Sequence, residues 1–353
     1  CQQRPRFPDV ASDEFDIIRR YFQRPELAFA APGVALGIGD DGALLRVGPG
    51  QELVMSMDLL QEGVHFLPET DPFLLGKRVL LVNLSDLAAM GAQPVCFTLA
   101  LSLPHVDSLW LERFSAGLGV VASAHTCPLV GGDTTACHPE RGALTVCIQV
   151  HGSVPQGAAL LRNGAHEGDM IYVTGTLGDA AAGLMLLQGR AHAERATPAQ
   201  RQALIEAFHL PESRVRAALR LRQLASAAID ISDGLASDLG HIARASGLGA
   251  VVNVDALPLS EAFRALIPEP ERLALALSGG DDYELCFTVP SDHTEMLEQQ
   301  MREAGTPVAC IGHIAAGQGV RWQRDGETLD LKVRGYNHFP TESADSTGSQ
   351  ERR

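Results

Sequence analysis

The segment 71–92 constrains the fold most, because it is strongly helical and holds a carboxylate within an apolar row. Asp71 can cap the start of this helix, Pro72 suits its first turn, and Gly91 suits its end. Burying an ionised, unpaired carboxylate costs several kcal/mol, so Asp86 needs a cation, an arginine from elsewhere in the fold, or a wetter surrounding. The helical row that contains Asp86 also includes Leu75, Val79, Val82 and Met90.

Aspartates close to glycines recur along the chain and suggest that Asp86 is part of a larger acidic site. Taken singly, such segments have ordinary explanations: Asp41-Gly42 suits a hairpin turn, and Ser232 or Asp233 suits a helix N-cap. Hard oxygen ligands without a Cys/His cluster favour Mg²⁺, which proteins usually hold together with substrate phosphates. The pattern therefore predicts a phosphate-bearing substrate such as a nucleotide. The segments are GIGDD at 37–41, SMD at 56–58, GGDTT at 131–135, DISDGL at 230–235 and GGDDYEL at 279–285.

The composition argues against several function classes. The 353 residues are enough for two domains, and 45% apolar with 20% charged residues is typical of a globular protein. A net charge of −15 opposes nonspecific binding to nucleic acid or anionic membranes. The seven cysteines lack the spacing of a zinc site or a disulfide framework, and the apolar runs are shorter than the ~20 residues of a membrane span. Because the start CQQRPRFPD does not resemble a signal peptide, we expect a cytoplasmic protein.

The hydrophobic pattern predicts a first α/β unit over residues 13–152. It opens with a short amphipathic helix at 13–24 and includes a second long helix at 106–125, which Asp107 can cap. We expect the second apolar strand to run into a Gly-rich loop and to pair with the third. The three strands are expected at 94–104, 127–135 and 143–154.

A second α/β unit is expected over residues 153–340, after a polar, Gly-rich junction. Its first helix follows a turn with Gly175 and Gly178, where backbone N–H groups could accept a phosphate, although such turns are often only structural. The tail 341–353 is low in hydrophobicity and is expected to be disordered. The other expected elements are a solvated excursion at 189–202, an Arg-rich helix at 212–226 and a helix that starts near Ser232 or Asp233.

Seven motifs follow one another along the chain: GIGDD, MDLLQEGVHF, VNLSDLAAMGAQP, GGDTT, YVTGTLGDAAAGL, AIDISDGLASDLGHIA and SGGDDYELCFTVP. In this order they resemble the thiamine-monophosphate kinases, a family in the aminoimidazole-ribonucleotide synthetase superfamily. The resemblance covers residues 14–339 and implies a mixed α/β and α+β fold of two domains with an ATP site between them. It also implies a homodimer joined through the first domain. The implied reaction is Mg²⁺- and ATP-dependent phosphorylation of thiamine monophosphate to thiamine diphosphate, with release of ADP.

The resemblance also assigns site residues position by position. Asp86, Asp133 and Arg162 are the implied catalytic residues, and Met57 can offer a metal only its backbone carbonyl. The implied Mg²⁺ ligands are Asp41, Ser56, Met57, Asp58, Asp86, Asp133 and Asp230, with Asp233 at a further ion. The implied ATP contacts are Gly132, Asp133, Arg162 and Ser232, and the implied thiamine contacts are His65, Asp281 and Tyr336.

The acceptor of this reaction is itself a phosphate, whose second pKa near ~6 leaves it largely ionised at neutral pH. No general base is then required, and we hypothesise direct in-line transfer, with Mg²⁺ and Arg162 screening the repulsion between two anions. Three positions depart from the family pattern. Met57 replaces a common Thr, Asp281 replaces a common Glu, and the segment 136–140 resembles an insertion before Arg141, which leaves the nucleotide contact of Arg141 open.

Two alternatives stay open at this point. One is another ATP-dependent enzyme of the superfamily, such as an aminoimidazole-ribonucleotide or selenophosphate synthetase. A selenophosphate synthetase would be expected to carry a reactive cysteine in a Gly-rich segment, and Cys1 lacks that setting. The other is a noncatalytic nucleotide sensor, which the intact acidic motifs disfavour.

Overall fold

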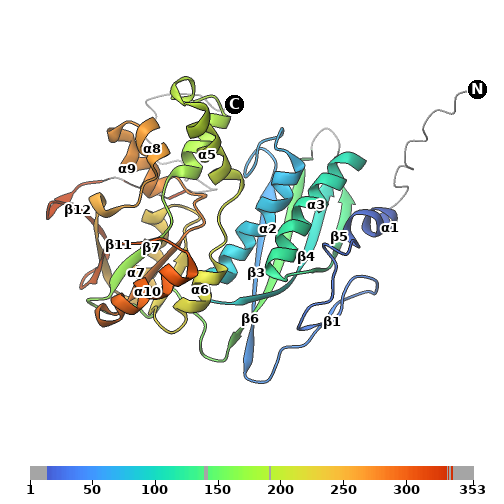
Figure 1. Ribbon diagram of the computed structural model, residues 1–353, viewed down its shortest axis with the longest axis horizontal. Helices are drawn as coiled ribbons and strands as arrows, with labels where there is room; N and C mark the ends of the chain where they lie inside the picture. The colour runs from blue at the N-terminus through green and yellow to red at the C-terminus, as the bar shows by residue number, and fades with distance from the viewer. Residues whose placement is uncertain (1–13, 139–141, 191, 332, 334, 337–353) are drawn as a thin grey trace, which may run out of the picture.

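The computed structural model describes residues 14–138, 142–190, 192–331, 333 and 335–336, and Figure 1 shows that the chain forms two units side by side. The first unit, drawn in blue and teal, is built on a four-stranded sheet. Within the described residues one pair of its neighbouring strands is parallel and the other two pairs are antiparallel. The strands are β3 (Gln51–Gln61), β4 (Gln93–Leu103), β5 (Leu129–Ala136) and β6 (Thr145–Pro155), in the order β3-β6-β4-β5.

Two long helices, α2 (Pro72–Ala89) and α3 (Ser108–His125), lie together on one face of this sheet (Figure 1). The side chain of Asp71 caps α2, because it accepts hydrogen bonds from the backbone N–H groups of Phe73 at 2.8 Å and Leu74 at 3.3 Å. Both helices confirm the sequence prediction. The smaller elements of this unit are α1 (Glu14–Ile17), a π-helical turn (Ile18–Phe22), β1 (Val34–Leu36) and β2 (Leu44–Leu45).

The second unit, drawn from green to red, is built on a seven-stranded sheet with the order β13-β12-β9-β11-β7-β10-β8 (Figure 1). Its strands are β7 (Met170–Thr174), β8 (Ala227–Asp230), β9 (Gly249–Asn253), β10 (Leu285–Val289), β11 (Val308–Ala315), β12 (Gly319–Arg324) and β13 (Glu327–Leu329). Its α-helices are α4 (Asp179–Leu187), α5 (Pro198–His209), α6 (Val215–Leu221), α7 (Leu235–Ser246), α8 (Glu261–Leu266), α9 (Glu269–Ser278) and α10 (Thr294–Ala304). Short 3₁₀ turns lie at Ala193–Arg195, Val254–Ala256 and Ser291–His293.

Helix α2 is buried on most of its circumference, because the sheet, α3 and the second unit all pack against it. The buried surface of α2 is therefore wider than the single apolar row that the sequence predicted. Polar side chains such as Arg78, Asn83 and Ser85 are buried on α2, whereas Asp86 itself is only half-buried. One apolar core continues from the first unit into α6 and β10 of the second. This shared core fixes how the carboxylates of the two units approach each other.

The contact between α2 and α3 depends on two glycines that face each other's helix. A Cβ atom on Gly76 would lie 2.2 Å from the carbonyl oxygen of Phe114, and one on Gly117 would lie 2.1 Å from that of Phe73. Both obstacles are backbone atoms, which cannot move aside as a flexible side chain would. The helices therefore pack with their backbones close together.

Replacing Gly117 with alanine should lower the free energy of unfolding by about 1–3 kcal/mol, because the added methyl group forces α2 and α3 apart. Gly240 in α7 provides the matched control, since a Cβ there meets no atom within 4 Å. Gly240→Ala should be neutral or slightly stabilising. Urea unfolding followed by circular dichroism measures both changes, and equal midpoints for the two variants would contradict the packing argument.

Several expected local structures were wrong. GGDTT lies inside β5 and not in a loop, and β6 pairs with β3 and β4, so the expected pairing of the second and third strands does not occur. The expected excursion at 189–202 already contains the start of α5, and the Arg-rich helix is confined to α6. Helix α7 begins at Leu235, after Gly234 and its left-handed φ of 105°, and not at Ser232 or Asp233.

The turn before α4 does not present its N–H groups freely. The backbone N–H of Gly178 donates to both carboxylate oxygens of the buried Asp282, at 2.9 and 3.1 Å. A carboxylate of the chain thus lies where the sequence allowed for a phosphate. The six described cysteines are free thiols, and no helix in the described ranges is long and apolar enough to cross a bilayer. The tail 341–353 lies outside the described residues.

Candidate active site

A cavity of about 250 Å³ lies where α2 and β3 of the first unit meet the acidic turns of the second. We call it the acidic pocket. It brings together many of the residues that the sequence analysis selected from distant motifs. Its lining includes Asp58, His65, Asp86, Asp230, Ser232, Asp233, Asp281, Tyr283 and Tyr336.

Strand β3 directs its polar residues to the pocket through its alternating pattern. Ser56 and Asp58 lie on the half-buried face of the strand, and the Ser56 hydroxyl donates to Asp86 Oδ2 at 2.6 Å. The backbone N–H of Asp58 donates to the Asn83 side chain of α2 at 3.1 Å. These two contacts hold Asp58 and Asp86 at one end of the pocket.

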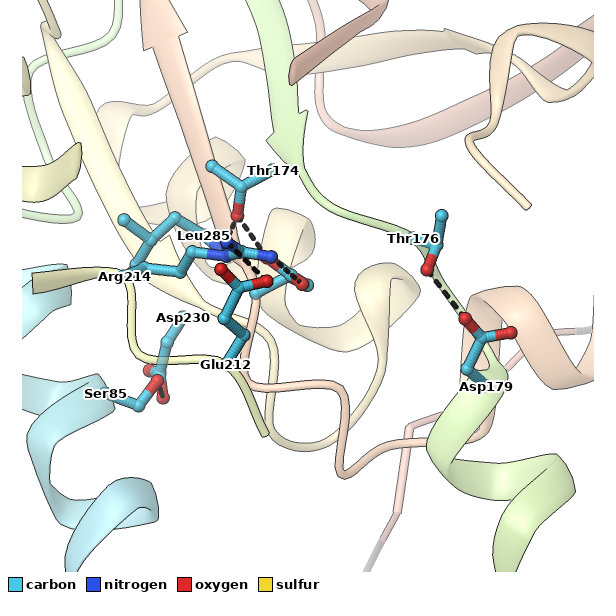
Figure 2. A network of polar contacts seen from close by, with 9 residues as sticks. Ser85, Thr174, Thr176, Asp179, Glu212, Arg214, Asp230 and Leu285 are labelled. Atoms are coloured by element: carbon cyan, nitrogen blue, oxygen red, sulfur yellow. Dashed lines mark hydrogen bonds and ion pairs between the residues drawn. The ribbon is translucent and has the colours of Figure 1, made fainter. Parts of the chain in front are cut away.

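The second unit supplies Asp230 from the end of β8. Its Oδ2 accepts a hydrogen bond of 2.8 Å from the Ser85 hydroxyl of α2, as Figure 2 shows. Asp230 is the last residue of β8, and its pairing with Leu285 of β10 fixes its position. A single turn of α2 therefore carries Asp86 of the first unit and binds Asp230 of the second unit through the Ser85 hydroxyl.

The carboxylates of the acidic pocket lie in one another's electric field. Burial first, and the charge of Asp86 second, raise the pKa of Asp58 to about 6 and that of Asp230 to about 7. Burial also raises the pKa of Asp86, while the Ser56 hydrogen bond and the charge of Arg162 oppose the rise. The pocket therefore stabilises positive charge.

The donor set suits Mg²⁺ held jointly with a substrate. Among the described residues, no group of three or more His, Cys, Asp or Glu side chains has the geometry to hold a metal ion alone. Mg²⁺ usually binds one or two protein carboxylates and completes its shell with water and substrate phosphate oxygens. Asp58, Asp86 and Asp230, with their raised pKa values, fit that way of binding.

Arg162 and Asp238 flank the pocket from the second unit. The positive charge of Arg162 opposes the rise in the pKa of both Asp86 and Asp238, so this arginine lies near both carboxylates. Sequence analysis missed Asp238, whose carboxylate accepts a hydrogen bond of 3.1 Å from the Asp233 backbone N–H. Burial raises the pKa of Asp238 to about 7. The sequence signals were its place in the motif AIDISDGLASDLGHIA and in the first turn of α7, where an aspartate also has an ordinary explanation as a residue that favours a helix start.

Three predicted residues lie elsewhere. Asp41, Gly132 and Asp133 line a separate hollow of about 760 Å³ near the N-terminal helix. Asp133 is in β5 and Asp58 is in β3, so two strands separate them, a span of roughly 14 Å at the usual strand spacing. Gly132 has a steric reason to be glycine, because a Cβ would lie 1.8 Å from the Leu99 carbonyl oxygen. The predicted metal ligands therefore do not all lie together in the structure of one chain.

Met57 is also not brought to the pocket. The Met57 side chain lies on the outer face of β3 and is 61% exposed. The Met57 carbonyl and the Asp58 N–H belong to the same trans peptide, so they point in opposite directions. Because the N–H points to Asn83, the carbonyl points toward β6. Arg141 lies outside the described residues.

The predicted thiamine contacts all line the acidic pocket. His65 Nδ1 accepts from the Gln61 N–H at 3.1 Å, so the proton of the neutral ring lies on Nε2. The Tyr336 backbone N–H donates to the Asp233 carbonyl at 3.0 Å and joins this late segment to the acidic turn. Asp281 has a partner that sequence analysis missed. Arg78 Nη2 of α2 lies 2.6 Å from Asp281 Oδ1.

A second polar network supports the turn that carries Asp281. Arg214 binds Glu284 through two bonds, Nε to Oε2 at 2.5 Å and Nη2 to Oε1 at 2.6 Å. The Thr174 hydroxyl also contacts Glu284 and accepts from the Leu285 N–H at 2.8 Å, and Glu212 lies against the same guanidinium (Figure 2). These buried bonds fix the end of the 281–284 turn at the start of β10.

Known proteins resemble the chain in both of its units. The family described as AIR synthase related protein, N-terminal domain, matches residues 39–154, and AIR synthase related protein, C-terminal domain, matches residues 166–324. Thiamine-monophosphate kinase of Salmonella typhimurium is 48% identical over 333 residues, which cover 94% of this chain and 100% of that relative. The chain belongs to the thiamine-monophosphate kinase family.

Solved structures of the thiamine-monophosphate kinase family share its fold. Thiamine-monophosphate kinase from Stenotrophomonas maltophilia K279a is 46% identical with a TM-score of 0.77, covering 84% of this chain and 92% of that one. A structure described as AaThiL complexed with AMPPCP and TMP is 31% identical with a TM-score of 0.72, covering 86% and 92%. The two-domain mixed fold that the motifs implied is thereby confirmed.

Proposed function

We propose that this chain transfers the γ-phosphoryl group of ATP to thiamine monophosphate and releases thiamine diphosphate and ADP. The observation that carries the proposal is the acidic pocket, where four aspartates from two units meet the three predicted thiamine contacts. The relative solved with AMPPCP and TMP supports it, because that protein was captured with an ATP analogue and a second phosphate-bearing ligand. The pocket would serve as the ATP and acceptor site between domains that we place at residues 13–152 and 153–340.

We propose direct in-line transfer without a general base. The acceptor phosphate is largely ionised at neutral pH, so no proton must be removed before it attacks. Bound Mg²⁺ would supply charge neutralisation between the two phosphate groups, held by Asp58, Asp86, Asp230 and Asp233. Arg162 would add a fixed positive charge beside Asp86, and the Ser56 and Ser85 hydroxyls orient the carboxylates. Asp41, Asp133, Gly132 and Ser232 remain predicted metal or nucleotide contacts.

The test is ³¹P NMR of the purified protein with ATP, Mg²⁺ and thiamine monophosphate, beside samples that lack the acceptor or the metal. New diphosphate signals of thiamine diphosphate that require all three components would support the kinase. ADP and free phosphate without that product would indicate a synthetase of the same superfamily. Bound ATP without turnover would indicate a nucleotide sensor.

Mg²⁺ added together with ATP should stabilise the folded protein, because it relieves the repulsion among Asp58, Asp86 and Asp230 and binds the substrate phosphates as well. At a Mg²⁺ concentration about 100 times its Kd, linkage predicts about 2.7 kcal/mol. Thermal unfolding in the presence of ATP with Mg²⁺, with EDTA and with NaCl of equal ionic strength measures the effect. Asp230→Asn should reduce the Mg²⁺ shift, while the exposed Asp292→Asn should keep it. A shift that NaCl reproduces would contradict specific binding.

We also propose a homodimer joined through the face of the four-stranded sheet that lies opposite α2 and α3 (Figure 1). Four apolar side chains of β3 alternate on this face and are 41–61% exposed, which is unusual for a soluble monomer surface. Self-complementary faces of this kind suit a two-fold contact. The four side chains are Leu53, Met55, Met57 and Leu59.

The cytoplasmic location stays a prediction.

Met55→Glu should convert the dimer to a monomer, because the contact would bury an unpaired carboxylate from each chain. Light scattering coupled to size-exclusion chromatography measures the mass directly. Leu109→Glu is the control, since Leu109 is also exposed but stands on α3, away from this face. A wild-type monomer, or a Met55→Glu dimer, would refute the proposed interface.

A further inference from the structure

Arg78 is a buried cation that joins the helix of Asp86 to the turn of Asp281. It is 1% exposed, and its guanidinium lies 4.3 Å from the ring centroid of Phe208 and 5.7 Å from that of Tyr283. Nη1 donates to the Phe208 carbonyl, while Nη2 binds Asp281 Oδ1 at 2.6 Å. Two aromatic rings and two hydrogen bonds therefore fix the position of this side chain.

Helix α2 contacts both acidic turns of the second unit from one face. Arg78 and Ser85 are seven residues apart, about two helical turns, and they bind Asp281 and Asp230 respectively. The two turns are also bonded to each other, because the Asp281 N–H donates to the Ser232 carbonyl at 2.8 Å. Any displacement of Arg78 is thus transmitted to Asp281.

The Asp281 carboxylate is held by one oxygen. Its described hydrogen bond uses Oδ1, and its side chain is 30% exposed where it lines the acidic pocket. Its backbone has a left-handed φ of 63°, a conformation that is uncommon for non-glycine residues but that aspartate tolerates in turns. Oδ2 is then oriented by the ion pair and by the turn, and not by bulk solvent.

We propose that Arg78 is a positioning residue for the acceptor substrate, a role that rests on the proposed function. By binding Oδ1, it fixes the Asp281 carboxylate and directs Oδ2 toward a hydrogen-bond donor of the acceptor. A carboxylate repels a phosphate, so this donor belongs to the heterocyclic part of thiamine monophosphate, which carries an amino group. Arg78 does not touch the reacting atoms and acts on them only through Asp281.

The test compares the steady-state kinetics of Arg78→Met and Arg78→Lys with the wild type. Arg78→Met should raise the KM for thiamine monophosphate on the order of tenfold, since a small misplacement of a contact group has effects of this size or larger. The KM for ATP should change less than about twofold, which is within the usual scatter of such effects. Arg78→Lys keeps the charge but loses the two-pronged geometry, so its KM for the acceptor should lie between the two.

A double-mutant cycle with Asp281→Asn separates positioning from a general structural effect. If Arg78 acts through Asp281, Arg78→Met should add little to the acceptor KM of Asp281→Asn. Lys77→Met on the same helix is the control and should leave both KM values unchanged. If Arg78→Met does not fold, Arg78→Lys and Asp281→Asn with their double variant complete the cycle.

The outcomes distinguish the two proposals. A wild-type protein that makes no thiamine diphosphate overturns the proposed function and the role of Arg78 with it. An active wild type whose Arg78 variants lose thermal stability but keep the acceptor KM overturns the positioning role alone. Equal increases in the KM for ATP and acceptor, or additive effects in the cycle, also overturn it.

Discussion

Asp86→Asn should lower kcat by at least about 10²–10³-fold while the protein keeps its fold. Losing a single electrostatic contact to a transition state commonly has an effect of this size. Asparagine keeps the shape and can still accept the 2.6 Å hydrogen bond from Ser56, but it removes the negative charge that would hold Mg²⁺. Coupled detection of ADP with thiamine monophosphate as acceptor measures kcat.

The control for this variant is Asp292→Asn, which removes an exposed carboxylate from a short turn after β10 that does not line the acidic pocket. It should retain full activity. Thermal unfolding of Asp86→Asn should show a midpoint at or above that of the wild type without metal, because one half-buried charge and its repulsion with Asp58 are gone. Full activity of Asp86→Asn would remove Asp86 from the mechanism, and a collapsed fold would make its role structural.

Arg214→Met should destabilise the second unit by about 3–5 kcal/mol, because it leaves the buried carboxylate of Glu284 without its bidentate partner. The double variant Arg214→Met/Glu284→Leu should recover much of this loss, since apolar groups replace both members of the pair. Urea unfolding monitored by circular dichroism gives the comparison. The variants also test whether the network around Glu284 supports the turn of Asp281.

Arg324 and Asp255 offer the matched exposed pair, at 3.1 Å between Nε and Oδ1. Arg324→Met should change stability by no more than about 1 kcal/mol, because solvent screens this pair and its loss leaves no buried charge. If Arg214→Met were as mild as Arg324→Met, the buried pair would contribute no more than a surface contact. If the double variant were as unstable as the single one, packing and not charge would explain the loss.

Local patterns predicted part of the site. The Asp71 cap at the start of α2 was expected and is confirmed, whereas the period-two alternation of β3, which turns Ser56 and Asp58 to the same side, was not predicted. The Asp-rich turn after β8 was also evident as a functional segment, although α7 starts later than expected. Asp86 was recognised as a carboxylate that needs a cation, a polar partner or a wetter surrounding. In the structure Asp86 accepts a hydrogen bond from the Ser56 hydroxyl, is affected by the positive charge of Arg162 and is only half-buried. An arginine from elsewhere in the fold and a wetter surrounding, two of the alternatives that the sequence left open, therefore both contribute.

Contacts between distant segments could not be predicted in the same way. Nothing near Arg78 in the chain indicates Asp281, and an arginine in an apolar helix has many possible partners. Strand order is equally nonlocal: the insertion of β6 and β4 between β3 and β5 separates Asp133 from Asp58, although both lie in motifs of the same resemblance.

The sequence by itself determined where helices and strands form and which of them carry carboxylates, because capping, periodicity and turn chemistry depend on neighbours along the chain. The tertiary structure decided which carboxylates meet. Ser85 reaches Asp230 and Arg78 reaches Asp281 only because α2 is buried between the two units. That burial is set by the total apolar surface removed from water across both units, a quantity to which no single segment contributes alone.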